Sequence, residues 1–145
     1  MNEELAMALC RGAAAAGLAA GAVADIRTGS VPLWLPALMG AAGLVLRLAA
    51  GRTGDLLWSL LPGAILFLTG LASRGQVGTG DGLMLLALGA CVSPAAALLA
   101  LFFGLAAEAL LGVILRVARG RSLRCGMPFL PFLCGGALCA FFLIR

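Results

Sequence analysis

Residues Ala95–Ala118 read AAALLALFFGLAAEALLGVILRVA, an apolar run in which only Glu108 and Arg116 are charged. A helix that crosses a hydrocarbon core about 30 Å thick needs about 20 such residues, so this run predicts a transmembrane helix. The whole chain of 145 residues has the same character, because 63% are hydrophobic, 11% are charged and the mean hydropathy is +1.13. A soluble domain has about 25% charged residues. The sequence therefore predicts an integral membrane protein.

Five further apolar stretches accompany this run, and each break between them carries Gly, Pro or charge, the usual punctuation between helices. The six predicted spans are Leu5–Ala24, Leu33–Ala50, Leu56–Ala72, Gly82–Val92, Ala95–Ala118 and Pro128–Ile144. In the first span, Gly17 and Gly21 form a small-residue motif that predicts close helix packing. We expect an all-α polytopic membrane protein, a bundle of about six transmembrane helices that makes residues 1–145 a single membrane-embedded domain.

The span Gly82–Val92 is shorter than the others. About eleven residues at a rise of about 1.5 Å cover only about 16 Å, roughly half of the hydrocarbon core. Either Ser93–Pro94 lies inside a continuing helix, or this helix begins in a cavity within the membrane. In the second case Asp81 lies below the lipid surface and faces protein or water.

The distribution of arginine predicts the orientation in the membrane. Six spans put both termini on one side, and the breaks after the first, third and fifth spans share the other side. The side opposite the termini holds six arginines, whereas the side of the termini holds four. The six are Arg27, Arg74, Arg116, Arg119, Arg121 and Arg124. Because cationic residues are enriched in cytoplasmic loops, we expect the termini to lie outside.

Composition excludes several kinds of site. The chain has no His, so it cannot use a Ser–His–Asp or Cys–His relay, an HExxH zinc site or a His-ligated haem. The net charge of +4 does not indicate nucleic acid, because the arginines are scattered with no aromatic interleaving. We expect no metal and no cofactor. The five cysteines have no metal-like spacing and are interpreted as small buried hydrophobic residues: Cys10, Cys91, Cys125, Cys134 and Cys139.

Three acids fall where an ionised side chain costs several kcal/mol and needs an explanation. Asp25 ends the first span, in the string ADIRTGSVP, and Asp81 precedes the fourth, in the string GQVGTGDGL. Each has an ordinary alternative, since Asp25 could be a surface charge at a helix end and Asp81 could cap the fourth helix. Glu108 lies well inside the fifth span.

The expected topology brings Asp25 and Asp81 to the same depth, because the first helix ends, and the fourth begins, on the cytoplasmic side. Two carboxylates in a low-dielectric site do not both ionise cheaply, so such a pair shares a proton. This arrangement suits aspartyl peptide hydrolysis. The ionised partner takes a proton from water, and the protonated partner donates to the scissile carbonyl or amide nitrogen.

Three motifs carry a resemblance to a known family. They are Asp25-Ile26-Arg27 with Pro32, then Gly78-Thr79-Gly80-Asp81, then the string PFLPFL of Pro128–Leu133. In order and spacing they resemble the signatures of the type IV prepilin peptidases, which are GxGD-type aspartyl membrane peptidases. The resemblance covers nearly the whole chain.

The resemblance implies a membrane aspartyl endopeptidase that removes short basic leader peptides from type IV prepilins or pilin-like proteins. Cleavage would occur at the cytoplasmic face, with Asp25 and Asp81 as the catalytic residues and with Gly78 and Gly80 as support for the loop. The implied setting is the plasma (inner) membrane of a prokaryote, in pilus assembly or protein secretion. The implied partners are the prepilin substrate and the lipid bilayer.

Two departures from the family pattern stand out. Leu83 occupies the position, two residues after the second Asp, where the family usually has Lys. The chain also has no CxxC motif, whereas the larger members carry paired CxxC motifs and N-methylate the mature pilin. We therefore expect a short peptidase-only form.

The remaining candidates each have two interpretations. Glu108 is either a protonated or hydrogen-bonded acid facing the bundle, or a group that tunes the carboxylate pair or meets substrate charge. Arg27 either marks the cytoplasmic side or binds lipid phosphate and orients the loop. We expect Pro128 and Pro131 to bend the start of the sixth helix, and Asp55 to cap the third.

Two other function classes remain open on the sequence. The chain could be a small proton or cation transporter, with Asp25, Asp81 and Glu108 as the path. It could also be a catalytically inactive partner in pilus or secretion assembly, since the Lys of the family is replaced by Leu83.

Overall fold

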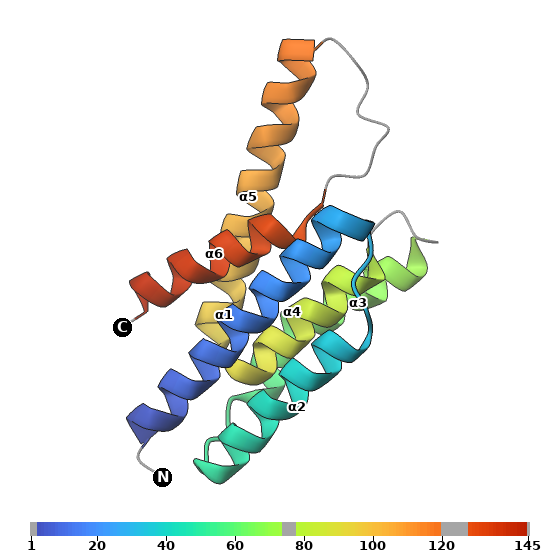
Figure 1. Cartoon of the computed structure of the whole chain (residues 1–145). Coiled ribbons are helices and arrows are strands. Elements are labelled where there is room, and N and C mark those ends of the chain that lie inside the picture. Colours follow the sequence, from blue (N-terminus) through green and yellow to red (C-terminus); the bar gives the residue numbers. More distant parts are fainter. Residues whose placement is uncertain (1–2, 74–77, 120–127, 145) are drawn as a thin grey trace.

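The computed structural model describes residues 3–73, 78–119 and 128–144, and all the regular structure in this part is α-helical (Figure 1). The six helices are α1 (Glu3–Thr28), α2 (Trp34–Ala49), α3 (Leu56–Ala72), α4 (Thr79–Cys91), α5 (Pro94–Arg119) and α6 (Leu130–Leu143). The predicted all-α class with six helices is therefore confirmed. Cys125 and most of the arginine-rich break after the fifth span lie outside the described residues.

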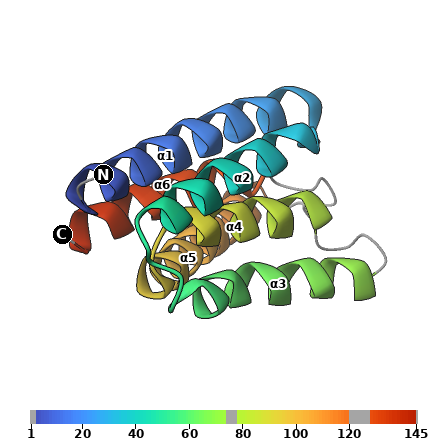
Figure 2. The ribbon, with the colours of Figure 1, turned by 90° about the horizontal axis from the view of Figure 1, so that it is seen from below.

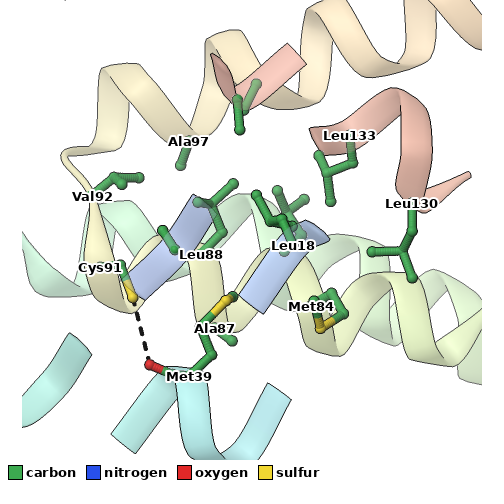
Figure 3. Packing of buried hydrophobic residues seen from close by; sticks show 14 of the residues in the cluster. Leu18, Met39, Met84, Ala87, Leu88, Cys91, Val92, Ala97, Leu130 and Leu133 are labelled. Carbon is green, nitrogen blue, oxygen red and sulfur yellow. Dashed lines mark hydrogen bonds between the residues drawn. The ribbon is translucent and has the colours of Figure 1, made fainter. Parts of the chain in front are cut away.

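Helix α4 is the centre of the bundle. Eight of its 13 residues are buried, and it packs against α1, α2, α3 and α5. In the view from below, α4 lies between α2 and α3 (Figure 2). The largest fully buried apolar side chains come from α1, α4 and α6, and Figure 3 shows Leu18, Met84, Leu88, Leu130 and Leu133 meeting there.

Glycine allows α3 and α4 to meet backbone against backbone. A Cβ atom at Gly82 would lie 2.5 Å from the Cα of Phe67, and one at Gly89 would collide with the carbonyl oxygen of Ser59. Ordinary van der Waals contact needs 3.4–4 Å. No larger residue fits at either glycine unless the two helices separate.

The end of α4 decides between the two interpretations of the short fourth span. Val92 has an extended backbone (φ −126°, ψ 166°), and Pro94 begins α5. The interpretation in which Ser93–Pro94 lies inside a continuing helix is therefore wrong. The 13 residues of α4 cover about 20 Å, less than a hydrocarbon core of about 30 Å.

Helix α1 continues further than the sequence predicted. It passes through Asp25 to Thr28 and stops at Gly29, which has φ +62° and donates its N–H to the carbonyl of Asp25 at 2.8 Å. Only glycine adopts this left-handed conformation without a steric penalty. Asp25 therefore lies in the last turns of a helix and not in the break that follows it.

Two smaller predictions are corrected. Asp55 occupies the position before α3, as expected for a cap, but its side chain forms no capping hydrogen bond. Cys10 and Cys91 are buried and Cys134 is half-buried, whereas Cys139 is exposed. The reason is its position on α6, since the buried stripe of that helix runs through Leu133, Gly136, Ala137 and Ala140.

The two longest helices, α1 and α5, are long and apolar enough to cross a membrane. The second half of α5 projects away from the other helices (Figure 1). Large apolar side chains on this part, among them Leu110, Val113 and Val117, are exposed. The other four helices are apolar but have 13 to 17 residues, so the crossing of a membrane by all six stays a prediction.

Candidate active site

Helices α1 and α4 place Asp25 and Asp81 at the same end of the bundle. The two helices run in opposite directions (Figure 1), and they touch where Gly21 faces Met84. A Cβ atom at Gly21 would lie 2.8 Å from Met84 Cε and 3.7 Å from Leu130 Cδ2. Asp25 lies one turn beyond this contact on α1, and Asp81 lies about one turn beyond it on α4. The structure thus places Asp25 and Asp81 at the same end of the bundle, as the expected topology requires.

The first turn of α4 also packs on the segment that follows α1. A Cβ atom at Gly80 would lie 3.5 Å from the Cβ of Val31. Asp81 precedes Gly82, where the apolar part of α4 begins. Burial, and after it the charges of Asp25 and Glu108, raise the pKa of Asp81 to about 6. Asp81 therefore interacts electrostatically with both Asp25 and Glu108.

Asp25 has a different environment from Asp81. Its Oδ2 accepts a long hydrogen bond, 3.4 Å, from the backbone N–H of Leu130, the first residue of α6. The N-terminus of a helix carries partial positive charge and free N–H donors, which stabilise an anion. Pro131 follows at the second position of α6 and has no N–H of its own. The start of α6 therefore supplies Asp25 with a backbone hydrogen-bond donor.

Gly78 gives the Asp81 carboxylate the space that it occupies. A Cβ atom at Gly78 would lie 2.5 Å from Asp81 Oδ2. Gly78 is itself the N-cap of α4, and Asp81 is the third residue of the helix with no side-chain capping bond. The alternative in which Asp81 caps the fourth helix is therefore wrong.

The structure also describes the other predicted site residues. Arg27 is exposed, and on a continuous helix it points away from Asp25, two residues earlier. Glu108 is half-buried on α5. Pro128 is exposed just before α6, and Pro131 is half-buried where a missing N–H costs the helix nothing.

The sequence prediction missed the donor at the start of α6, because it looked for side chains and the donor is a backbone amide. A signal was present, since a proline in the first turn marks a helix N-terminus with free N–H groups. Within the described ranges, no three Cys, Asp or Glu side chains are close enough to hold a metal ion.

Comparison with known proteins gives one match. A profile described as the type IV leader peptidase family matches residues 13–117, a segment that includes Asp25, Asp81 and Glu108 and ends within α5. No curated protein and no solved structure matches the chain.

Proposed function

This chain belongs to the type IV leader peptidase family, and from that premise we propose that it is a membrane aspartyl endopeptidase. Its substrates are type IV prepilins or pilin-like proteins, from which it removes a short basic leader at the cytoplasmic face. The observation that supports this most is the position of Asp25 and Asp81, 56 positions apart in the sequence, at the same end of the bundle.

The different surroundings of Asp25 and Asp81 support different catalytic roles for the two acids. Asp25, which accepts the N–H of Leu130, acts as the base, and Asp81, with its raised pKa, acts as the acid. Asp25 takes a proton from water as the water oxygen attacks the scissile carbonyl carbon, while Asp81 gives its proton to the carbonyl oxygen. The tetrahedral intermediate then collapses as Asp25 returns the proton to the departing nitrogen and Asp81 recovers its own.

Glu108 tunes this pair. Its charge is one of those that raise the pKa of Asp81, so it helps to keep the acid protonated. The three acids also give this end of the bundle a negative potential that attracts a basic leader. Leu83 in place of the Lys of the family removes a positive charge two residues from Asp81, and that change favours the same attraction.

A multi-pass position in the membrane is supported by the surface of the bundle. Besides α5, the outer faces of α2, α3 and α6 carry large exposed apolar side chains, such as Leu38, Leu57, Trp58 and Phe142. Apolar surface of this extent is unstable in water and fits a lipid surrounding. The arginine distribution supports an orientation with the termini outside and the end with Asp25 near the cytoplasm.

The test is co-expression with the pilin-like proteins of the same organism, with leader removal measured by intact mass. We expect cleavage by the wild type and none by Asp25→Asn or Asp81→Asn. Glu4→Gln is the matched control, because Glu4 is an exposed acid near the start of α1, far along that helix from Asp25. All variants are checked for a folded, monodisperse state by size exclusion and circular dichroism.

Cleavage by both aspartate variants at the wild-type rate would refute the dyad. If the wild type cleaves none of the pilin-like proteins, the inactive assembly partner or the transporter becomes the better hypothesis. Proton flux in liposomes separates these two. The grouping of Asp25, Asp81 and Glu108 weighs against a transport path, because the acids of such a path are spread through the membrane depth.

A further inference from the structure

A cavity of about 190 Å³ lies at the end of the bundle opposite Asp25 and Asp81. It opens where α4 stops, since Cys91, Val92 and Ser93 line it. The residues of α1 that line it lie between Ala6 and Arg11. Arg11 lies 14 positions, or about 21 Å along the helix, before Asp25. The short α4 leaves a space here that the longer helices around it enclose.

The cavity is lined by three arginines, Arg11, Arg47 and Arg52, and by one acid, Asp55. Three positive charges and one negative charge give it a net charge of +2. Among the residues that the structure describes, no other acidic side chain lines it. Arg11 and Arg47 are half-buried and Arg52 is exposed. Positive charges that are only partly compensated by protein favour the binding of an anion.

Each arginine is positioned by a contact that occupies one of its terminal nitrogens. Arg47 Nη1 donates to Ser59 Oγ at 2.8 Å, which ties α2 to the start of α3. Arg11 Nη2 donates to the carbonyl of Ile144 at 2.7 Å, just after α6. Arg52 Nη1 lies 2.8 Å from the thioether of Met7, a weak acceptor. A guanidinium has five N–H donors, so each arginine keeps donors for a ligand.

The shape of these donors and the rest of the lining indicate the ligand. The planar fork of a guanidinium matches the oxygens of a phosphate in a bidentate manner. The remaining lining is mostly apolar and includes Ala6, Leu46, Ala50 and Ala96. The cavity is more than ten times the roughly 15 Å³ that one water molecule needs. A phosphate attached to an apolar body meets both parts of this surface.

We propose that this cavity binds a phosphate group, which the headgroup of an anionic phospholipid supplies in the leaflet opposite the carboxylate pair. The bound phosphate joins Arg11 on α1, Arg47 on α2 and Arg52 in the connection to α3. It thereby closes the end of the bundle that α4 does not reach. A free phosphate anion has the same chemistry, and the test separates the two sources.

The test measures the binding of three soluble probes to the full chain in detergent, in a phosphate-free buffer. The probes are dioctanoyl phosphatidylglycerol, inorganic phosphate and dioctanoylglycerol, which lacks the phosphate. Bound lipid is counted by native mass spectrometry, and the shift in Tm is followed by the fluorescence of Trp34 and Trp58. We expect phosphatidylglycerol to bind and to raise Tm, and dioctanoylglycerol to do neither. Equal effects of inorganic phosphate would identify the free anion as the ligand.

Arg52→Gln is the variant of choice, because Arg52 is exposed and its loss breaks only the contact to Met7. Loss of one charged donor pair raises Kd for phosphatidylglycerol about tenfold. Arg116→Gln, an exposed arginine on the projecting part of α5, is the matched control and binds as the wild type does. Arg52→Lys, which keeps the charge without the fork, gives an intermediate Kd and covers the case in which Arg52→Gln does not fold.

Two results would overturn the proposal. One is equal binding of phosphatidylglycerol and dioctanoylglycerol, which would make the cavity a site for acyl chains. The other is an unchanged Kd in both Arg52 variants, which would place bound lipid elsewhere on the bundle.

Discussion

The contact between α3 and α4 gives a sharp prediction, because the packing leaves no space for a methyl group at position 82. Its Cβ would lie 2.5 Å from Phe67 Cα and 2.6 Å from Phe67 N, whereas ordinary contact needs 3.4–4 Å. Backbone atoms cannot rotate away, so Gly82→Ala must move the two helices apart by about 1 Å. Overpacking of this kind costs about 1–3 kcal/mol.

The same displacement reaches the carboxylate pair, since Gly82 follows Asp81 directly. A misplacement of about 1 Å in a catalytic group lowers the rate by up to about 100-fold. We therefore expect Gly82→Ala to lower both Tm and the rate of leader removal. Gly21→Ala is the matched control, because the atom that its Cβ would crowd is Met84 Cε at 2.8 Å, the far end of a flexible side chain that can turn aside, and its other neighbours would be at ordinary contact distance.

The assay compares the two variants with the wild type in one detergent, by Tm and by the initial rate of leader removal measured by intact mass. We expect Gly21→Ala to stay close to the wild type in both. The packing argument is refuted if Gly82→Ala melts and cleaves as Gly21→Ala does.

Three further predictions concern the acids and the cysteines. We expect the cleavage rate to fall as the pH rises above about 6, where Asp81 loses its proton. Glu108→Gln moves this fall to lower pH, because it removes a charge that raises the pKa of Asp81. An unshifted pH profile of the rate in Glu108→Gln would contradict the coupling. Folding raises the pKa of Asp81 from 3.8 to about 6, so the stability that this acid contributes is present below 3.8 and is lost as the pH rises through about 6. Asp81→Asn therefore raises Tm relative to the wild type at pH 7.5 but not at pH 3.5, and an equal difference at both values would show that ionisation is not the cause. A membrane-permeant maleimide labels Cys139 in the folded protein much faster than Cys10 or Cys91, which are buried, as mass shifts in single-cysteine variants would measure.

The sequence predicted the helices well because their apolar runs are long and separated by strong breaks. It placed the end of the first helix too early, because a charged Asp25 after an apolar run resembles a boundary. The helix in fact continues to the first glycine in a left-handed conformation, Gly29. The pairing of Asp25 with Asp81 was predictable from topology alone, since the direction of each helix fixes which ends meet.

Two features depend on how the helices pack and were beyond a reading of one sequence. The donor for Asp25 is the backbone amide of Leu130, more than one hundred positions away. Pro131 marks the free N–H groups at the start of α6, but the sequence does not show that Asp25 is their partner. The three arginines of the cavity come from separate segments, Arg11 on α1 and Arg47 and Arg52 at the end of α2 and beyond it. In the sequence they look like scattered interfacial charges, and only the early end of α4 brings them together.

Two bonds described above set a common length for α1 and α6. Arg11 on α1 holds the carbonyl of Ile144, and Asp25 holds the amide of Leu130, so the two helices are joined near both ends. The joined residues are 14 positions apart in each segment. One residue inserted into α6 would advance its far end by about 1.5 Å and rotate it by about 100°, so both bonds could not form together. The spacing of the bonded positions on α1 and that on α6 must therefore stay equal. We expect α6 to tolerate substitution on its outer face far better than any change in its number of residues.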